Sequence, residues 1–150
     1  MKKVSKILLT VGGIFHIVNG ISLLISSLTL IILAVVFFVT GNLYGPDFVN
    51  GEVSEEYVQL SMNMAAILYL FLSVMFIGLG IVSFIASKIT FKAGESGDKK
   101  SLIAAIVFGL ILDAKVAAVG GIFGLIASNK DEDKKQVSDD EPAVAKEVVK

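Results

Sequence analysis

Three long apolar runs constrain this chain more than any other feature of its sequence. They cover residues 7–39, 62–87 and 101–129, and only the third contains formal charges, Asp113 and Lys115. Each run exceeds the roughly 20 apolar residues with which an α-helix crosses a hydrocarbon core of about 30 Å. One soluble core does not need three such runs in 150 residues. We therefore expect an all-α integral membrane protein with three transmembrane helices, at about 7–39, 62–87 and 101–128.

Composition excludes several classes of function. Hydrophobic residues make up 55% of the chain, and a net charge of -1 gives no basic surface for nucleic acid. Cysteine is absent, which excludes thiol catalysis, disulfides and thiolate metal sites. The single histidine, His16, has no second strong metal ligand near it in the sequence. All the basic residues are Lys, a usage typical of an AT-rich bacterial genome.

The distribution of Lys predicts the topology. Lys2, Lys3 and Lys6 precede the first run, the loop 41–61 contains only acidic charges, and the loop 88–100 is rich in Lys. By the positive-inside rule the N-terminus and the loop 88–100 lie in the cytoplasm, and the loop 41–61 lies outside. We expect a retained signal-anchor helix and a multi-pass protein of the bacterial cytoplasmic membrane.

The first run is too long for one perpendicular crossing. At about 1.5 Å per residue it measures about 50 Å, so part of it is expected to project from the outer face. Ser54, Glu55 and Glu56 have the pattern of a helix N-terminus, with a capping hydroxyl followed by acids. The first two helices are therefore predicted to form a hairpin that continues above the bilayer.

The third run allows two interpretations. A break at residues 113–115 would give segments of 12 and 14 residues, 101–112 and 116–129, and a four-span hairpin topology. We prefer one helix, because Asp-Ala-Lys lacks Gly and Pro and each half would be too short to cross. The charged tail, residues 129–150, has no apolar periodicity and is expected to be disordered.

Small residues recur at helical spacing in the first and third runs. Residues 11–20 read VGGIFHIVNG and residues 119–128 read VGGIFGLIAS. Small residues let the backbones of membrane helices approach closely, so these positions predict helix-packing faces, within one chain or in a homo-oligomer. The predicted packing residues are Gly12, Gly13, Gly20, Ala105, Gly109, Ala117, Gly120, Gly121 and Gly124.

Four polar residues in the apolar runs form a predicted intramembrane cluster: His16, Asn19, Asp113 and Lys115. Asp113 shares the small-residue stripe of the third run, and its depth matches that of His16 and Asn19. An unpaired charge at mid-membrane costs about 2.5–3.5 kcal/mol on insertion scales. We therefore expect Asp113 to face the bundle interior as a polar clasp near His16 or Asn19. A proton or ion relay through His16 and Asp113 is the alternative.

No motif of an enzyme or cofactor site is present, because the P-loop, Rossmann, H-E-x-x-H and G-x-S-x-G patterns are all missing. We expect a non-catalytic membrane protein without cofactors, acting through helix–helix contacts as an accessory subunit or an immunity-type protein against a membrane-active toxin. Its expected partners are the lipid bilayer and a second copy or another membrane protein. The alternative is an oligomeric channel or proton-linked transporter subunit using His16 and Asp113.

The opening KILLTVGGIFHIVNGISLL, the acidic loop and the ending VAAVGGIFGLIASNK resemble small bacterial membrane proteins of domain-of-unknown-function family 4064. The resemblance covers about residues 4–130 and lies in composition rather than in a specific motif. It implies four short spans with a Gly-rich final pair, which fits the hairpin interpretation of the third run. It implies no activity and no functional residues.

Overall fold

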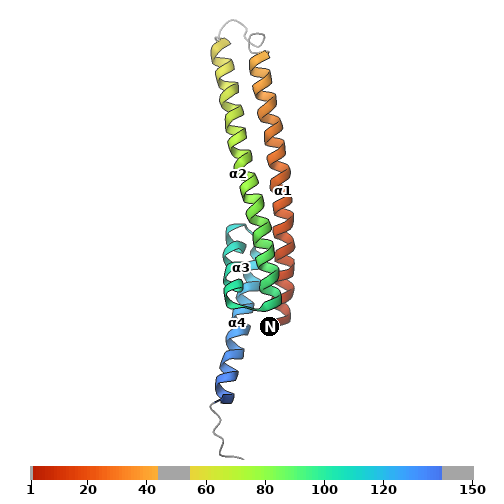
Figure 1. The fold of residues 1–150 in the computed structure, drawn as a ribbon, viewed down its shortest axis with the longest axis vertical. Helices are drawn as coiled ribbons and strands as arrows, with labels where there is room; N and C mark the ends of the chain where they lie inside the picture. Colours follow the sequence, from red (N-terminus) through yellow and green to blue (C-terminus); the bar gives the residue numbers. More distant parts are fainter. Residues whose placement is uncertain (1, 44–54, 140–150) are drawn as a thin grey trace, which may run out of the picture. The chain divides into compact units, whose positions relative to one another are not determined.

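The computed structural model describes residues 2–43 and 55–139, with side chains over residues 2–43 and 56–130. These residues form four helices, and no strand occurs among them: α1 (Lys2–Leu43), α2 (Glu55–Ser96), α3 (Lys99–Ile111) and α4 (Lys115–Asp139) (Figure 1). The predicted all-α class is therefore confirmed. The helix start predicted from Ser54, Glu55 and Glu56 agrees with the first residue of α2.

The chain divides into two compact units. The hairpin unit comprises residues 17–84, and the four-helix unit comprises residues 1–16 and 85–150. The helices α1 and α2 each contribute one segment to both units, whereas α3 and α4 belong to the four-helix unit alone.

In the hairpin unit, α1 and α2 pack through small residues that recur every seven positions. The buried set is Gly20, Ser27, Ala34 and Gly41 on α1, and Ala66, Ser73 and Gly80 on α2. A Cβ atom on Gly20 would lie 3.2 Å from the backbone oxygen of Gly80, so the two backbones nearly touch. A spacing of seven keeps one face of each helix turned to its partner over many turns. The short side chains on that face bring the helices close together.

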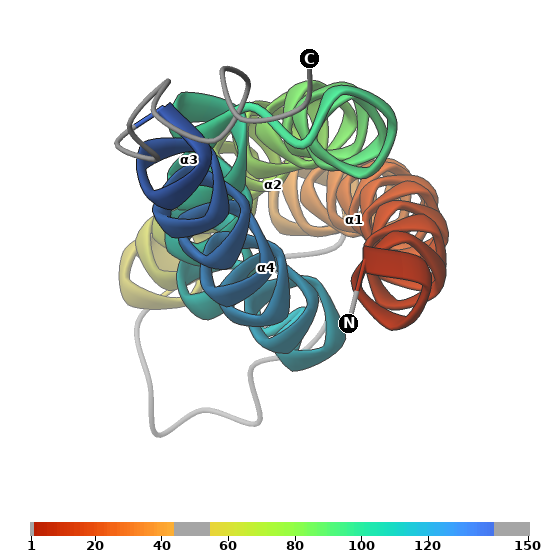
Figure 2. The ribbon, with the colours of Figure 1, turned by 90° about the horizontal axis from the view of Figure 1, so that it is seen from below.

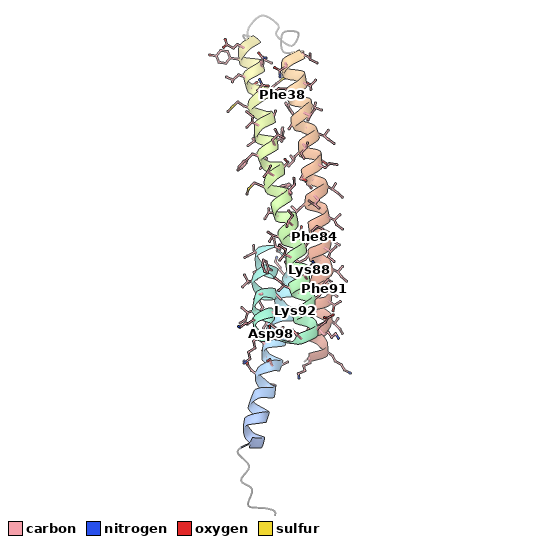
Figure 3. The ribbon with its side chains drawn as sticks, viewed as in Figure 1. Phe38, Phe84, Lys88, Phe91, Lys92 and Asp98 are labelled. Carbon is pink, nitrogen blue, oxygen red and sulfur yellow. The ribbon has the colours of Figure 1, made fainter. Side chains whose placement is uncertain are left out.

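The remaining surface of these two helices is apolar and exposed. The most apolar 18-residue windows of α1 and α2 have mean hydropathies of 2.8 and 2.5, and only 11% and 17% of their residues are buried. A core helix of a soluble protein would be mostly buried. Both helices are thus long and apolar enough to cross a membrane, and their side chains project outward along most of their length (Figure 3).

Polar and aromatic contacts join the two helices toward the end of the hairpin unit where α1 ends and α2 begins. The amide nitrogen Nε2 of Gln59 donates a 2.9 Å hydrogen bond to Oδ1 of Asn42. The rings of Phe37 and Tyr69 pack with their centroids 5.4 Å apart. The outer loop predicted for residues 41–61 is thus partly helical, and its middle, 44–54, lies outside the described residues.

The four-helix unit has a small core. Leu9, Ala93, Leu102 and Ala105 form a buried cluster with one residue from α1, one from α2 and two from α3, and Leu125 of α4 packs against it. Viewed along the helices, α1, α2, α3 and α4 follow one another around this core (Figure 2). Leu9 and Leu102 are the largest fully buried side chains, so the core consists mainly of small residues.

The third apolar run does not form the single helix that we preferred. The helix α3 ends at Ile111, and Asp113 adopts a left-handed backbone conformation with φ of 56° before α4 begins at Lys115. Aspartate is one of the few residues other than Gly that adopts this conformation, so Asp113 can occupy the position after the helix end that Gly usually takes. The absence of Gly and Pro from residues 113–115 therefore does not prevent a helix break there. The hairpin interpretation agrees with the observed helix boundaries.

Two other boundaries differ from the prediction. The loop expected over residues 88–100 shrinks to Gly97 and Asp98, because α2 continues to Ser96 and α3 begins at Lys99. Gly97 has φ of 64°, a conformation that allows this tight connection. The tail expected to be disordered over 129–150 is helical as far as Asp139, and the rest of it lies outside the described residues.

Candidate functional site

The helix α4 packs on α1 in the four-helix unit through backbone-to-backbone contact. A Cβ atom on Gly12 would lie 2.6 Å from the Cα of Ala117. One turn away, a Cβ on Gly120 would lie 2.9 Å from the backbone nitrogen of Leu9. Real side-chain atoms do not approach backbone atoms so closely. These glycines therefore permit the observed separation of the two helices.

A buried hydrogen bond strengthens this contact. The Ser5 hydroxyl donates to the backbone oxygen of Gly120 over 2.8 Å. Gly124 lies next to both Ser5 and Leu102, so a side chain there would collide with α1 and α3 together. The contact is therefore specific in register as well as close.

The helices α3 and α4 meet through the same kind of surface. A Cβ on Gly109 would lie 2.6 Å from the backbone nitrogen of Ala118, and one on Gly121 would lie 2.9 Å from the backbone oxygen of Leu102. Ala105 is fully buried in the core. Every residue of the predicted packing set in these two helices lies at a helix contact.

The helix α2 approaches α1 on another side. A Cβ on Gly13 would lie 2.8 Å from the ring of Phe91, and one on Gly94 would lie 3.3 Å from Cβ of Leu9. The remaining predicted packing residue, Gly20, lies in the hairpin unit against Gly80. The prediction did not include Gly80 and Gly94. Both belong to a series of small residues, Ala, Ser or Gly, that recurs every seven positions on α2 at 66, 73, 80, 87 and 94.

The predicted polar cluster is not assembled as expected. His16 is fully buried in the four-helix unit, and neither of its ring nitrogens has a hydrogen-bond partner among the described residues. Asn19 is half-buried and belongs to the hairpin unit.

The polar clasp built on Asp113 is wrong. The side chain of Asp113 is 83% exposed and that of Lys115 is 81% exposed, and they form an ion pair of 3.3 Å between Oδ1 and Nζ. On a continuous helix these two side chains could not pair, because residues two apart point in different directions. The break at Asp113 removes that restriction and turns both side chains outward at the tip of the α3–α4 hairpin.

The helix contacts show at which level, meaning which position along the axis of α1, several charged residues of the four-helix unit lie. Both α2 and α4 run antiparallel to α1, since higher-numbered residues of each meet lower-numbered residues of α1. Counting from these contacts places Lys115 at the level of Ile14, and Lys88 close to the level of His16. Lys92 follows Lys88 one turn along α2 (Figure 3). Three exposed ammonium groups therefore gather within about one turn of the level of the α3–α4 tip.

A pocket of about 380 Å³ lies at the opposite end of the four-helix unit. Its wall contains Lys2, Lys3, Ser5 and Lys6 of α1, residues 93–96 of α2, Gly97 of the following turn, Leu102 of α3, and Gly124, Ala127 and Ser128 of α4. Three lysines, Lys2, Lys3 and Lys6, line the pocket together with the acidic Glu95, and the Ser5 hydroxyl already donates to Gly120. The pocket therefore lacks a uniform set of donors for one ligand.

Asp98 caps α3 beside this pocket. Its Oδ2 accepts hydrogen bonds from the backbone nitrogen of Ser101 at 3.0 Å and from the Ser101 hydroxyl at 2.9 Å. These bonds favour the charged carboxylate and lower the pKa of Asp98. The cap explains why α3 starts immediately after the Gly97 turn.

Within residues 2–43 and 56–130, no group of three or more His, Asp or Glu side chains is arranged to hold a metal ion. Comparison with protein-family models, curated proteins and solved structures gave no match for this chain. The resemblance of residues 4–130 to family 4064 therefore stays a prediction. The functional argument rests on helix surfaces and charges.

Proposed function

We propose that the chain is a non-catalytic integral protein of the bacterial cytoplasmic membrane that acts through helix–helix contacts. It serves as an accessory subunit of a membrane complex or as an immunity-type protein against a membrane-active toxin. The N-terminus lies in the cytoplasm, because the Lys residues flank residues 7–39 on that side while residues 17–84 contain none.

The observation that carries this proposal is the outward surface of the hairpin unit. Small residues hold α1 and α2 together, and almost every large apolar side chain points away from that contact. Such a surface suits lipid and the faces of other transmembrane helices. Helix association in membranes depends on close packing rather than on a hydrophobic driving force.

One observation favours the alternative, an oligomeric channel or proton-linked transporter subunit. The buried and unpartnered ring of His16 is the kind of group that a proton pathway uses. Asp113, the second residue of that pathway, is instead exposed and paired with Lys115. The accessory function is therefore the better supported proposal.

Site-directed photocrosslinking in cells tests the proposal. A photoreactive residue at Val35, which is exposed on α1, should give a discrete protein adduct, and the same residue at Ala34, which is buried against α2, should not. Absence of a protein adduct from Val35 and from other outward positions of both helices would contradict helix–helix action. Proton flux into liposomes that is lost in His16→Ala would favour the transporter alternative.

A further inference from the structure

The length of α1 requires that one end of its apolar run lie outside the hydrocarbon. The run from Ile7 to Val39 measures about 50 Å at about 1.5 Å per residue, whereas the hydrocarbon core is about 30 Å thick. An average tilt of about 20° shortens its projection only slightly. The question is which end leaves the hydrocarbon.

The charges distinguish the two ends. Residues 17–39 of α1 and 62–84 of α2, which belong to the hairpin unit, contain no charged residue at all. At about 1.5 Å per residue each of these segments measures about 35 Å, enough to fill the hydrocarbon with a modest tilt. The four-helix unit instead exposes Lys88, Lys92 and Lys115. Charged side chains are costly at the centre of a bilayer, so the end of α1 beside these lysines is the end that leaves it.

The level of these charges along α1 then indicates where the hydrocarbon ends on the cytoplasmic side. Lys88 and the Asp113–Lys115 pair lie close to the level of His16, immediately before residues 17–39 of α1 begin. Leu110 and Ile111, beside the turn, are 67% and 69% exposed and can enter the edge of the hydrocarbon. The tip of the α3–α4 hairpin thus combines apolar and charged side chains, as surfaces at the membrane interface do.

We propose that Lys88, Lys92 and Lys115 form a lysine collar that contacts the phosphates of anionic lipids at the inner face of the membrane. Only α1 and α2 cross the bilayer, and the α3–α4 hairpin stays on the cytoplasmic side. Three Lys against one acid, Asp113, give the collar a net positive charge, which anionic headgroups attract. This inference rests on the proposed membrane location. It replaces the expected third span, and it replaces the expected projection of the first run from the outer face with a projection on the cytoplasmic side.

Single-cysteine labelling tests the position of the turn, since the chain contains no Cys. A membrane-impermeant maleimide should label Lys115→Cys only in inverted vesicles and Tyr57→Cys only in intact cells, and it should label Val35→Cys in neither. Labelling of Lys115→Cys from outside, or from neither side, would overturn the inference. If the chain were not a membrane protein, it would be absent from the membrane fraction, which is a separate outcome.

Lipid dependence tests the collar itself. The protein should have a higher thermal midpoint in nanodiscs containing phosphatidylglycerol than in pure phosphatidylcholine. The triple variant Lys88→Gln, Lys92→Gln, Lys115→Gln should lose most of this shift. The matched variant Lys100→Gln, Lys130→Gln, which changes exposed lysines away from the collar, should keep it. An unchanged shift in the triple variant would refute the lipid contact.

Discussion

The two units of this protein use the same apolar and small residues for different purposes. In the hairpin unit, contacts at Gly20 and Gly80 leave about 3.2–3.3 Å for an added Cβ, and residues 17–84 contain no Lys. In the four-helix unit, contacts at Gly12 and Gly109 leave only 2.6 Å, and Lys residues lie around the unit. The difference shows that the helices of the four-helix unit approach one another more closely at Gly12 and Gly109 than α1 and α2 do at Gly20 and Gly80.

The largest expected effect is a methyl group at the tightest contact. Gly12→Ala should destabilise the four-helix unit by about 2 kcal/mol, because the new Cβ meets the backbone of Ala117 rather than a flexible side chain. Gly78→Ala is the matched control, since nothing lies within 4 Å of a Cβ there. The control should be neutral or stabilising by up to about 1 kcal/mol, the usual gain of Ala over Gly in a helix. Unfolding in mixed micelles measures both variants.

The same substitution in the hairpin unit sharpens the comparison. Gly20→Ala should cost less than Gly12→Ala, because its nearest contacts are at 3.2 Å and two of them are ring atoms of Phe84 that can move. Equal losses at the two positions would contradict the distinction between the units.

A smaller effect is expected at the turn that breaks the third run. Asp113→Val should cost about 1–2 kcal/mol, because a β-branched side chain is strained at a φ of 56°. Asp113→Asn should keep the turn while removing the charge, and so it separates backbone strain from the ion pair with Lys115. If Asn proved as harmful as Val, the ion pair rather than the backbone would define the turn.

Removal of the interhelical hydrogen bond should have a modest effect. Ser5→Ala deletes the donor to Gly120, and hydrogen bonds between membrane helices average only about 0.6 kcal/mol. Ser61→Ala is the control, because its hydroxyl bonds only within α2, to Val58. A loss well above 1 kcal/mol at Ser5 alone would mean that this bond, rather than glycine packing, holds α4 in place.

The smallest effect concerns the Asp98 cap. Its lowered pKa means that its stabilisation is complete above the ordinary value of 3.8 and is lost as the pH falls through the lower pKa of the folded state. Asp98→Ala should therefore be less stable than the parent at neutral pH, and the difference should vanish in acid. Asp98→Ser retains a capping oxygen without a titrating group, so it should show no such pH dependence. Helicity followed by circular dichroism against pH is the measurement.

Much of the helical architecture could be predicted from the sequence, because apolar length and the acidic start at Glu55 are local properties. The seven-residue series through Gly20 and Gly80 is also present in the sequence, but it was not part of the prediction, which considered only the first and third runs. The break at residues 113–115 stayed the less favoured alternative, because the left-handed conformation of Asp113 depends on how α3 and α4 fold back on each other. The predicted polar clasp is wrong for the same reason. It assumed that Asp113 lies within a continuous helix at the depth of His16 and Asn19, whereas a residue at a helix break can turn its side chain outward.

The central claim is that the bilayer surrounds the hairpin unit and ends at the lysine collar. Spin labels at Val35→Cys and Ile103→Cys, both exposed positions, measure this in nanodiscs through collisions with oxygen, which enters lipid, and with a nickel chelate, which stays in water. The account predicts that the label at position 35 meets oxygen far more than nickel, and that the label at position 103 shows the reverse preference. An oxygen-dominated profile at both positions would place α3 in the hydrocarbon and contradict the account.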